Sequence, residues 1–475
     1  MAKKPTTWER TRKFFNDVHL WLGLASGIIV FLVCLSGTIY TFNTEIREAA
    51  TPELFKVQAA AGQQVLPAET MIASLETATG GKVVNVKVPA EATRSWQFGV
   101  KKESKEGKGE GKAKVEGRSE RAGKPADAKA AEAKGGAAKG GPKGGGRPTT
   151  YYVNPYTGEI LGNTGEIKNG TVTFMTYMFS LHRWLLLDKV EEPIFEGLEN
   201  RELGSYISGT ATILFTLGVI TGMVIWFPRK MRAWKQGLKI KTNGSWKRTN
   251  HDLHNTLGFY SCIFLFLMGV TGPFFSFDWY RNGLRKSLGT YEAPAMAGES
   301  KGAGDGKGKG EGRGERGGRG ERGERAGADA AAEAPKTVSF AALQATTNQV
   351  FNFKGDYMIA LGGGEGPIAV SKFKTGFFAP AAADKVIIDP VTAQPVEVVY
   401  FAKLPFNERV SASIKSLHLG DVYGMFTKII YFFACLIATS LPVTGTMIWL
   451  NKMKKKPARR NQPKEQDAMP VTTSL

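Results

Sequence analysis

The stretch VHLWLGLASGIIVFLVCLSGTIYTF, residues 18–42, decides the fold of this protein. It is apolar over about the length needed to cross a bilayer, and it carries one histidine, His19, near its start. A second stretch, LHNTLGFYSCIFLFLMGVTGPFFSF at residues 253–277, aligns with it without a gap. The alignment pairs His19 with His254 and Gly23 with Gly258. The chain therefore contains an internal repeat that begins in a membrane helix.

Four transmembrane helices are predicted, at residues 19–42, 205–227, 255–277 and 428–450. Basic stretches precede the first helix (1–18), join the second to the third (228–254) and follow the fourth (451–475). Alternating helices place all three stretches on one side, which the positive-inside rule makes cytoplasmic. Much of the net charge of +20 then reflects topology, so nucleic acid is not expected as a partner. The first run is too long for a cleaved signal peptide and has no clean cleavage site.

Two large segments, residues 43–204 and 278–427, are expected on the outer side. Each contains an insertion rich in Gly, Lys, Arg, Glu and Ala, at 101–148 and 298–335. These insertions have too few bulky apolar residues to fold, so disorder is predicted for both. Around them, each segment shows one helical pattern followed by strand patterns, with VNPYTGE and IDPVTAQ in matching places. A small α+β domain is predicted in each segment.

The repeat also includes the second and fourth helices. SLHRW precedes one and SLHLG the other, which pairs His182 with His418. VITGMVIW matches PVTGTMIW inside the helices. The predicted fold is thus a membrane α-helical bundle of two pseudo-symmetric repeats, related by an axis along the membrane normal, with two outer α+β domains. A Ser-Gly or Thr-Gly dipeptide lies about one turn before the end of each helix: Ser36-Gly37, Thr221-Gly222, Thr271-Gly272 and Thr444-Gly445.

The five histidines fall into two predicted pairs and one remainder. His19 and His254 lie at the cytoplasmic end, and His182 and His418 lie at the outer end. A histidine at a helix end is often only a polar boundary residue, and an internal duplication copies such a residue whether or not it has a function. However, the two-fold axis would bring each pair together, and small residues follow on the same helix face: Gly23, Gly27 and Gly258. His251 has no partner, because Asn16 occupies its place in the first repeat.

Haem is the cofactor that these two pairs of histidines favour. Two imidazoles make a poor zinc site, whereas a haem iron needs only two axial ligands. The chain has no Cys-x-x-Cys-His stretch, so covalent attachment is excluded and two b haems are predicted. The alternative is that the small residues serve helix packing alone. The three cysteines lie in apolar helices and are expected to be free.

Several of these segments resemble one known family. Residues 8–42, HDLHNTLGFY (251–260) and TGMVIWFPRK (221–230) resemble the PepSY-associated transmembrane family of bacterial inner-membrane proteins. YYVNPYTGEI and VIIDPVTAQPV are similar to PepSY domains. The resemblance implies a haem-containing reductase of ferric siderophores that acts at the periplasmic face, with cytoplasmic termini. It also implies that His19, His182, His254 and His418 are haem ligands, while the long insertions depart from the family pattern.

The predicted function is therefore electron transfer across the inner membrane for iron uptake. The haem at His19 and His254 would accept electrons from quinol or a cytoplasmic reductase. The haem at His182 and His418 would reduce the ferric siderophore, since Fe(II) binds hard oxygen ligands less tightly than Fe(III). Arg183 and Trp184 are expected at a haem edge or as an interfacial anchor. His251 is interpreted as a boundary residue and as the fallback ligand.

Two other functions remain open at this stage. The PepSY-like domains could bind or regulate a partner in the cell envelope without catalysis. A permease for siderophore or haem is the other alternative, but the helices contain almost no charged residues that would mark a polar route through the membrane.

Overall fold

The computed structural model describes residues 6–59, 62–102, 148–228, 234–292, 338–361 and 366–454. The chain divides into two compact units. The helical unit comprises Met1–Arg47, Gly170–Arg281 and Lys415–Leu475, and the sheet unit comprises Glu48–Asn169 and Asn282–Ile414. Apart from residues 101, 102 and 148, the predicted disordered insertions lie outside the described residues, so their disorder remains a prediction.

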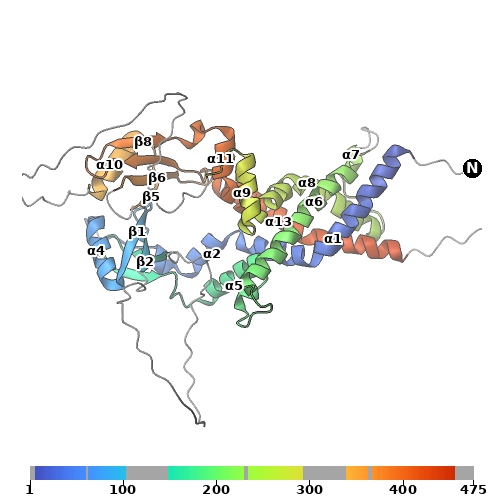
Figure 1. The fold of residues 1–475 in the computed structure, drawn as a ribbon, viewed down its shortest axis with the longest axis horizontal. Helices are drawn as coiled ribbons and strands as arrows, with labels where there is room; N and C mark the ends of the chain where they lie inside the picture. Colours follow the sequence, from blue (N-terminus) through green and yellow to red (C-terminus); the bar gives the residue numbers. More distant parts are fainter. Residues whose placement is uncertain are drawn as a thin grey trace, which may run out of the picture. The chain divides into compact units, whose positions relative to one another are not determined.

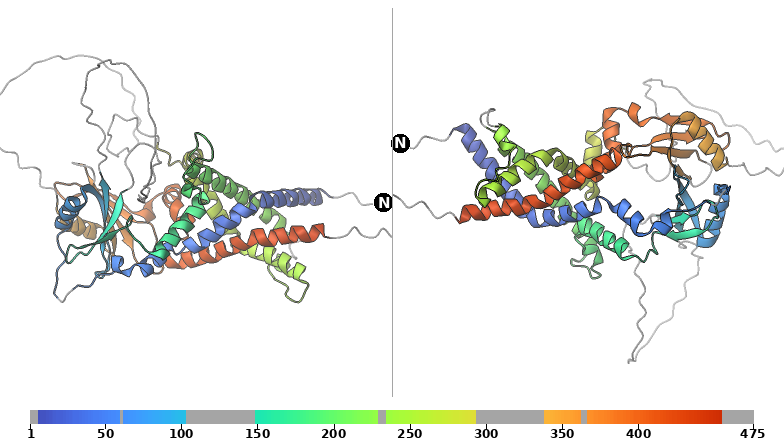
Figure 2. Two further views of the ribbon diagram at one scale, coloured as in Figure 1. Left: turned by 90° about the horizontal axis from the view of Figure 1, so that it is seen from below. Right: turned by 180° about the vertical axis from the view of Figure 1, so that it is seen from behind.

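Four long helices form the helical unit: α1 (Thr7–Tyr40), α6 (Asn200–Trp226), α8 (Trp246–Thr271) and α13 (Gly424–Met453). All four are long and apolar enough to cross a membrane. Helices α6 and α13 each pack against both α1 and α8, so α1 and α8 are diagonal in the bundle (Figures 1 and 2). Trp21, Ile28 and Ile263 are more than half exposed on its surface, as expected for side chains in lipid. The protein is thus a multi-pass membrane protein.

All four of these helices begin earlier than the apolar runs predicted, and the difference is largest for α1 and α8. Helix α1 begins at Thr7, where Thr6 and Glu9 form a capping box, and α8 begins at Trp246. His19 and His254 therefore lie inside their helices and do not open them. The apolar runs mark the part that lipid can surround, whereas capping and backbone hydrogen bonding continue the helix beyond it.

Short helices carry the other two histidines. His182 lies in the last turn of α5 (Gly170–Trp184), which packs against α1 and α6. His418 lies in the last turn of α12 (Ile414–Leu419). The remaining short helices and 3₁₀ turns are α2 (Asn43–Ala50), α3 (Pro52–Phe55), η1 (Leu187–Lys189), α7 (Trp234–Gly237), η3 (Pro273–Phe275), α9 (Asp278–Ser287), η4 (Phe401–Lys403) and α11 (Phe406–Ala412).

The sheet unit contains one antiparallel sheet of eight strands in the order β4-β3-β2-β1-β5-β6-β7-β8. The first half has α4 (Ala68–Thr79), β1 (Gly81–Val88), β2 (Trp96–Lys102), β3 (Thr149–Val153) and β4 (Ile160–Asn163). The second half has α10 (Phe340–Val350), β5 (Gly355–Ala360), β6 (Ile368–Lys374), β7 (Asp384–Ile388) and β8 (Pro395–Val399). The helix and strand patterns predicted for the two outer segments are found in the structure.

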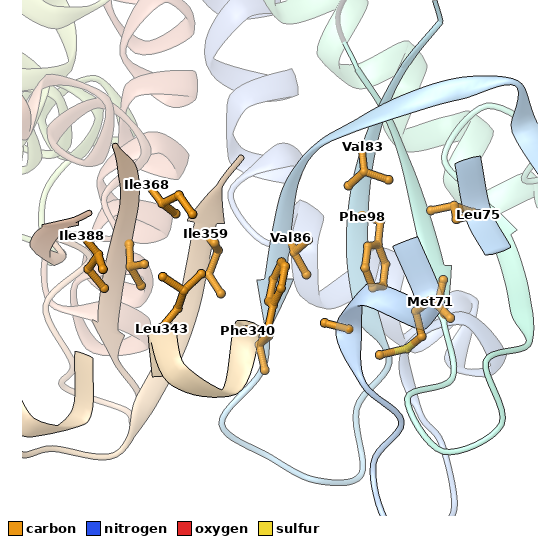
Figure 3. Packing of buried hydrophobic residues seen from close by; sticks show 14 of the residues in the cluster. Met71, Leu75, Val83, Val86, Phe98, Phe340, Leu343, Ile359, Ile368 and Ile388 are labelled. Atoms are coloured by element: carbon orange, nitrogen blue, oxygen red, sulfur yellow. The ribbon is translucent and has the colours of Figure 1, made fainter. Parts of the chain in front are cut away.

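The sequence analysis expected a small α+β domain in each outer segment. In the structure, the two segments instead share this one sheet. β1 pairs with β5 in register, with Val86 opposite Ile359. This pairing removes two exposed strand edges, which would otherwise be sites of unwanted association. Figure 3 shows that side chains of α4 and α10 meet the same face of the sheet, where Val86, Phe98 and Ile359 are fully buried. One apolar core therefore runs through both halves.

Truncation at the junction of the two halves should destabilise the sheet unit. Ile359→Ala should lower the free energy of unfolding by about 2–5 kcal/mol, because Ile359 is fully buried against strand β1. Urea denaturation of the detergent-solubilised protein, followed by protease susceptibility, measures this loss. Val396→Ala is the control, since Val396 is 64% exposed and its truncation should change stability by less than about 0.5 kcal/mol. Equal losses for the two variants would contradict a shared core.

Candidate cofactor site

The structure brings the four repeated histidines together in two pairs. His19 of α1 faces His254 of α8 with ring centroids 6.2 Å apart and the ring planes at 78°. His182 of α5 faces His418 of α12 with centroids 6.1 Å apart and the planes at 56°. We call these the first pair and the second pair. Each pair joins one residue from each half of the chain.

Backbone carbonyls of neighbouring helices bind two of the imidazoles. His19 Nδ1 lies 2.9 Å from the carbonyl oxygen of Gly218 in α6, and His182 Nδ1 lies 2.8 Å from that of Val33 in α1. A carbonyl oxygen can only accept a hydrogen bond, so Nδ1 carries the proton in both rings. The remaining nitrogen, Nε2, then has a free lone pair.

Threonine hydroxyls orient three of the imidazoles in the same way. The Oγ1 atoms of Thr221, Thr444 and Thr271 lie 3.1, 2.8 and 3.1 Å from Nδ1 of the facing histidine. The histidines are His19, His254 and His418 in that order. Each hydroxyl donates its own proton to a carbonyl in its helix: Leu217, Ser440 and Leu267. The hydroxyl therefore accepts from the imidazole, and Nδ1 again carries the proton.

A glycine next to each of these positions makes room for the ring. A Cβ atom added to Gly222 would lie 3.1 Å from His19 Cε1, and one added to Gly37 would lie 3.0 Å from His182 Cε1. At Gly445 the corresponding distance to His254 Cε1 is 3.3 Å, and at Gly272 the distance to His418 Cε1 is 3.5 Å. Each of the four Ser-Gly and Thr-Gly dipeptides thus places a glycine beside one histidine ring, and the three threonines also bind the ring. The sequence showed that these dipeptides recur, but not what they contact.

An open cavity surrounds the first pair. It encloses about 1470 Å³ of space, including the part that is open to solvent. Gly23, Gly27 and Gly258, the small residues predicted to lie on the ligand face, line it. No atom lies within 4 Å of a Cβ added to Gly23, and the nearest neighbours at the other two are 3.8 and 3.9 Å away. The stripe of small residues therefore faces space and not a tightly packed helix.

His251 lies in the wall of the same cavity but is held differently. Its side chain is 57% exposed, and Nδ1 lies 3.6 Å from Oδ1 of Asp252. Asp252 also accepts a hydrogen bond from Arg248. His251 thus belongs to a polar group at one end of the cavity, and the described contacts do not pair its ring with another histidine.

The second pair is enclosed by protein. The Phe275 ring lies 5.3 Å from the His418 ring, and Arg183 donates a hydrogen bond of 3.0 Å to the Phe275 carbonyl oxygen. Burial lowers the pKa of His182, and burial together with the neighbouring His182 lowers the pKa of His418 to about 4. Both rings are neutral near pH 7, which is the form that binds a metal ion.

The separation of the rings fits one metal ion between each pair. A zinc–imidazole bond is about 2.0–2.1 Å long, and with about 1.1 Å from nitrogen to ring centre, two opposed ligands place their centroids about 6.3 Å apart. The observed values are 6.2 and 6.1 Å. Within the described residues there is no cluster of three or more His, Cys, Asp or Glu side chains that could hold a metal ion by itself. A metal ion held by either pair would therefore need ligands beyond the two imidazoles.

Comparison with protein families gives one match. Residues 17–452 match the model of the PepSY-associated TM region. A search of curated proteins finds no match to this chain.

Acid should destabilise the cofactor-free protein through the second pair. A histidine whose pKa is lower in the folded state than its usual 6.5 stabilises the fold fully above pH 6.5, and this contribution is lost as pH falls toward about 4. Thermal unfolding of the cofactor-free protein should show this loss, at most about 3 kcal/mol for His418. His418→Gln, which cannot titrate, should flatten the profile between pH 6.5 and 4. An unchanged slope would contradict a buried neutral His418.

Proposed function

The chain belongs to the PepSY-associated TM region family, and on that premise we propose that it is a di-haem electron-transfer protein that reduces ferric siderophores. His19 and His254 would hold one b haem, and His182 and His418 would hold the other. The protein would lie in the bacterial inner membrane with both termini in the cytoplasm, and reduction of Fe(III) to Fe(II) would occur at the periplasmic face for iron uptake.

The hydrogen bonding of the imidazoles carries this proposal. Ring centroids about 6 Å apart also occur in ordinary aromatic contacts, so the separation alone does not distinguish a ligand pair from packing. However, Nδ1 of every ring is bound to a different helix, which leaves Nε2 as the nitrogen available in each pair. Metal-binding histidines are typically held through their second nitrogen in this way.

The residues present fit a haem better than a bare metal ion. A haem iron takes four nitrogens from its own ring and needs only two axial ligands from the protein. The cavity beside the first pair is lined by Leu20, Leu24 and Val219, which suit a flat apolar ring. When bound, the haems would supply one-electron carriers at two places in the bundle. This chain would set their position and limit access of water.

The charges favour one orientation across the membrane. Lys452, which lies in the basic C-terminal stretch at residues 451–475, lines the cavity of the first pair. By the positive-inside rule this end is cytoplasmic, so the first pair is the entry point for electrons from quinol or a soluble reductase. The histidines of the second pair lie in the last turns of α5 and α12, at the opposite ends of the membrane helices. This pair would deliver electrons to the ferric siderophore.

The purified protein should contain two haems with two histidine ligands each. Its absorption spectrum in mild detergent should show a Soret band and, after dithionite, a reduced α band. His19→Ala and His418→Ala should each remove about half of the haem, because each destroys one site. Pyridine haemochrome assay measures the haem-to-protein ratio. Protein produced with ample haem but lacking both bands would refute the proposal, and would leave a binding module of the cell envelope as the function to test.

A pair of variants in α6 separates a specific site from general damage to this helix. Gly222→Ala should weaken haem binding at the first pair, because its methyl group would lie 3.1 Å from His19 Cε1. Ile220→Ala lies two residues earlier in α6, truncates a side chain that is 44% exposed and does not line the cavity, and should retain both haems. Loss of haem in both variants would count against the assigned role of Gly222.

Reduction of ferric siderophores is tested by trapping Fe(II). Dithionite-reduced protein, freed of excess reductant, should transfer one electron to each Fe(III) chelate and form the coloured ferrous complex of a trapping ligand. The rate should fall at least about tenfold in His418→Ala, because the haem facing the substrate is lost. Stopped-flow absorption at the α band follows reoxidation of the haem. Full rates with His418→Ala would place substrate reduction elsewhere.

A further inference from the structure

Arg183 joins the two sides of the second pair. It directly follows His182 in α5, and its Nη2 donates to the carbonyl oxygen of Phe275, whose ring lies 5.3 Å from His418. The Arg183 carbonyl oxygen accepts a hydrogen bond of 2.8 Å from Ser208 in α6, which fixes the backbone. The guanidinium also lies 5.4 Å from the centre of the Trp184 ring. Its position is therefore set by three neighbouring segments.

The charge of Arg183 lies beside both rings of the second pair. Arg183 is the next residue after His182, and its guanidinium is hydrogen-bonded to Phe275, whose ring lies 5.3 Å from the His418 ring. A guanidinium remains protonated throughout the pH range of folded proteins. The second pair therefore experiences a permanent positive charge.

In the sequence, the residues next to the ligands of the first pair are uncharged, although Lys452 lines the cavity of that pair. His19 is flanked by Val18 and Leu20, and His254 is flanked by Leu253 and Asn255. Asp252, two residues before His254, is negative and is paired with Arg248. The two pairs thus share ring separation and hydrogen bonding but differ in the charge beside them.

This difference has a consequence for a redox cofactor. One-electron reduction of a haem iron lowers the charge of the site by one unit. A fixed positive charge in a poorly solvated surrounding favours the reduced form, since the electrostatic interaction is weakly screened there. A charge that lies near only one of two haems therefore changes the equilibrium constant for electron transfer between them.

We propose that Arg183 is the positioning residue that raises the reduction potential of the haem at the second pair, so that electrons move from the first pair to the second. The inference rests on the proposed di-haem function and adds the residue whose charge favours that direction of electron flow. Arg183 touches neither iron nor substrate in this role, because it acts through the field at the histidines. A purely structural role for Arg183 would leave the potential unchanged as long as both haems are bound.

Redox potentiometry of the full-length protein tests the proposal. Arg183→Gln should lower the midpoint potential of the haem that is lost in His418→Ala and leave the other haem unchanged. The equilibrium constant for electron transfer between the haems should move about tenfold toward the first pair, which equals 59 mV for a one-electron couple. Arg183→Lys keeps the charge and should retain most of the wild-type difference. Arg183→Met keeps the long apolar stem and serves as a second neutral variant if Gln prevents folding.

Arg201→Gln is the matched control. Arg201 lies 4.1 Å from the centre of the same Trp184 ring, but it does not adjoin a histidine of the second pair in the sequence, and the described hydrogen bond to Phe275 comes from Arg183. Its removal should leave both potentials unchanged. Both haems present with equal potentials in wild type and Arg183→Gln would overturn the proposal, as would equal shifts with Arg201→Gln. Absence of haem from the wild-type protein would instead refute the proposed function.

Discussion

The structure of the helical unit depends on the hydrogen bond from Nδ1 of each repeated histidine to a neighbouring helix. His19 and His254 are bound by α6 and α13, and His182 and His418 by α1 and α8. In an apolar bundle, a buried imidazole left without this partner costs about 1–3 kcal/mol. Each membrane helix therefore both orients a histidine and is held in register by it. A glycine lies close to each ring, because the rings approach the backbone of the neighbouring helix closely.

These hydrogen bonds also give the two imidazole nitrogens different roles. Nδ1 fixes the ring to a helix, and Nε2 is left for a ligand between paired rings. Because each pair takes one ring from each half of the chain, neither half contains a complete site. The functional proposal follows from this arrangement, since a cofactor that supplies four ligands of its own needs only such a pair.

The sheet unit applies the same principle with different chemistry. Each half has an exposed strand edge, at β1 and at β5, and the two edges pair with one another. The halves then share one core, in which Val86 and Ile359 are adjacent and fully buried. In both units, therefore, an element that is incomplete in one half is completed by the other. The charge of Arg183 distinguishes the halves most clearly. Arg183 follows His182 in the first half, whereas the uncharged Leu419 follows His418 in the second.

The sequence by itself determined the four membrane helices, the elements of the sheet and the candidate histidines. Bilayer length, strand alternation and internal repetition are local patterns that can be read along one chain. It also indicated which histidines should pair, but only through an inferred axis. Tertiary structure decided that the outer segments share one sheet, that Ser-Gly and Thr-Gly positions lie beside the rings, and that Arg183 reaches Phe275. These features depend on contacts between residues tens to hundreds of positions apart, and residue type and spacing alone do not specify them.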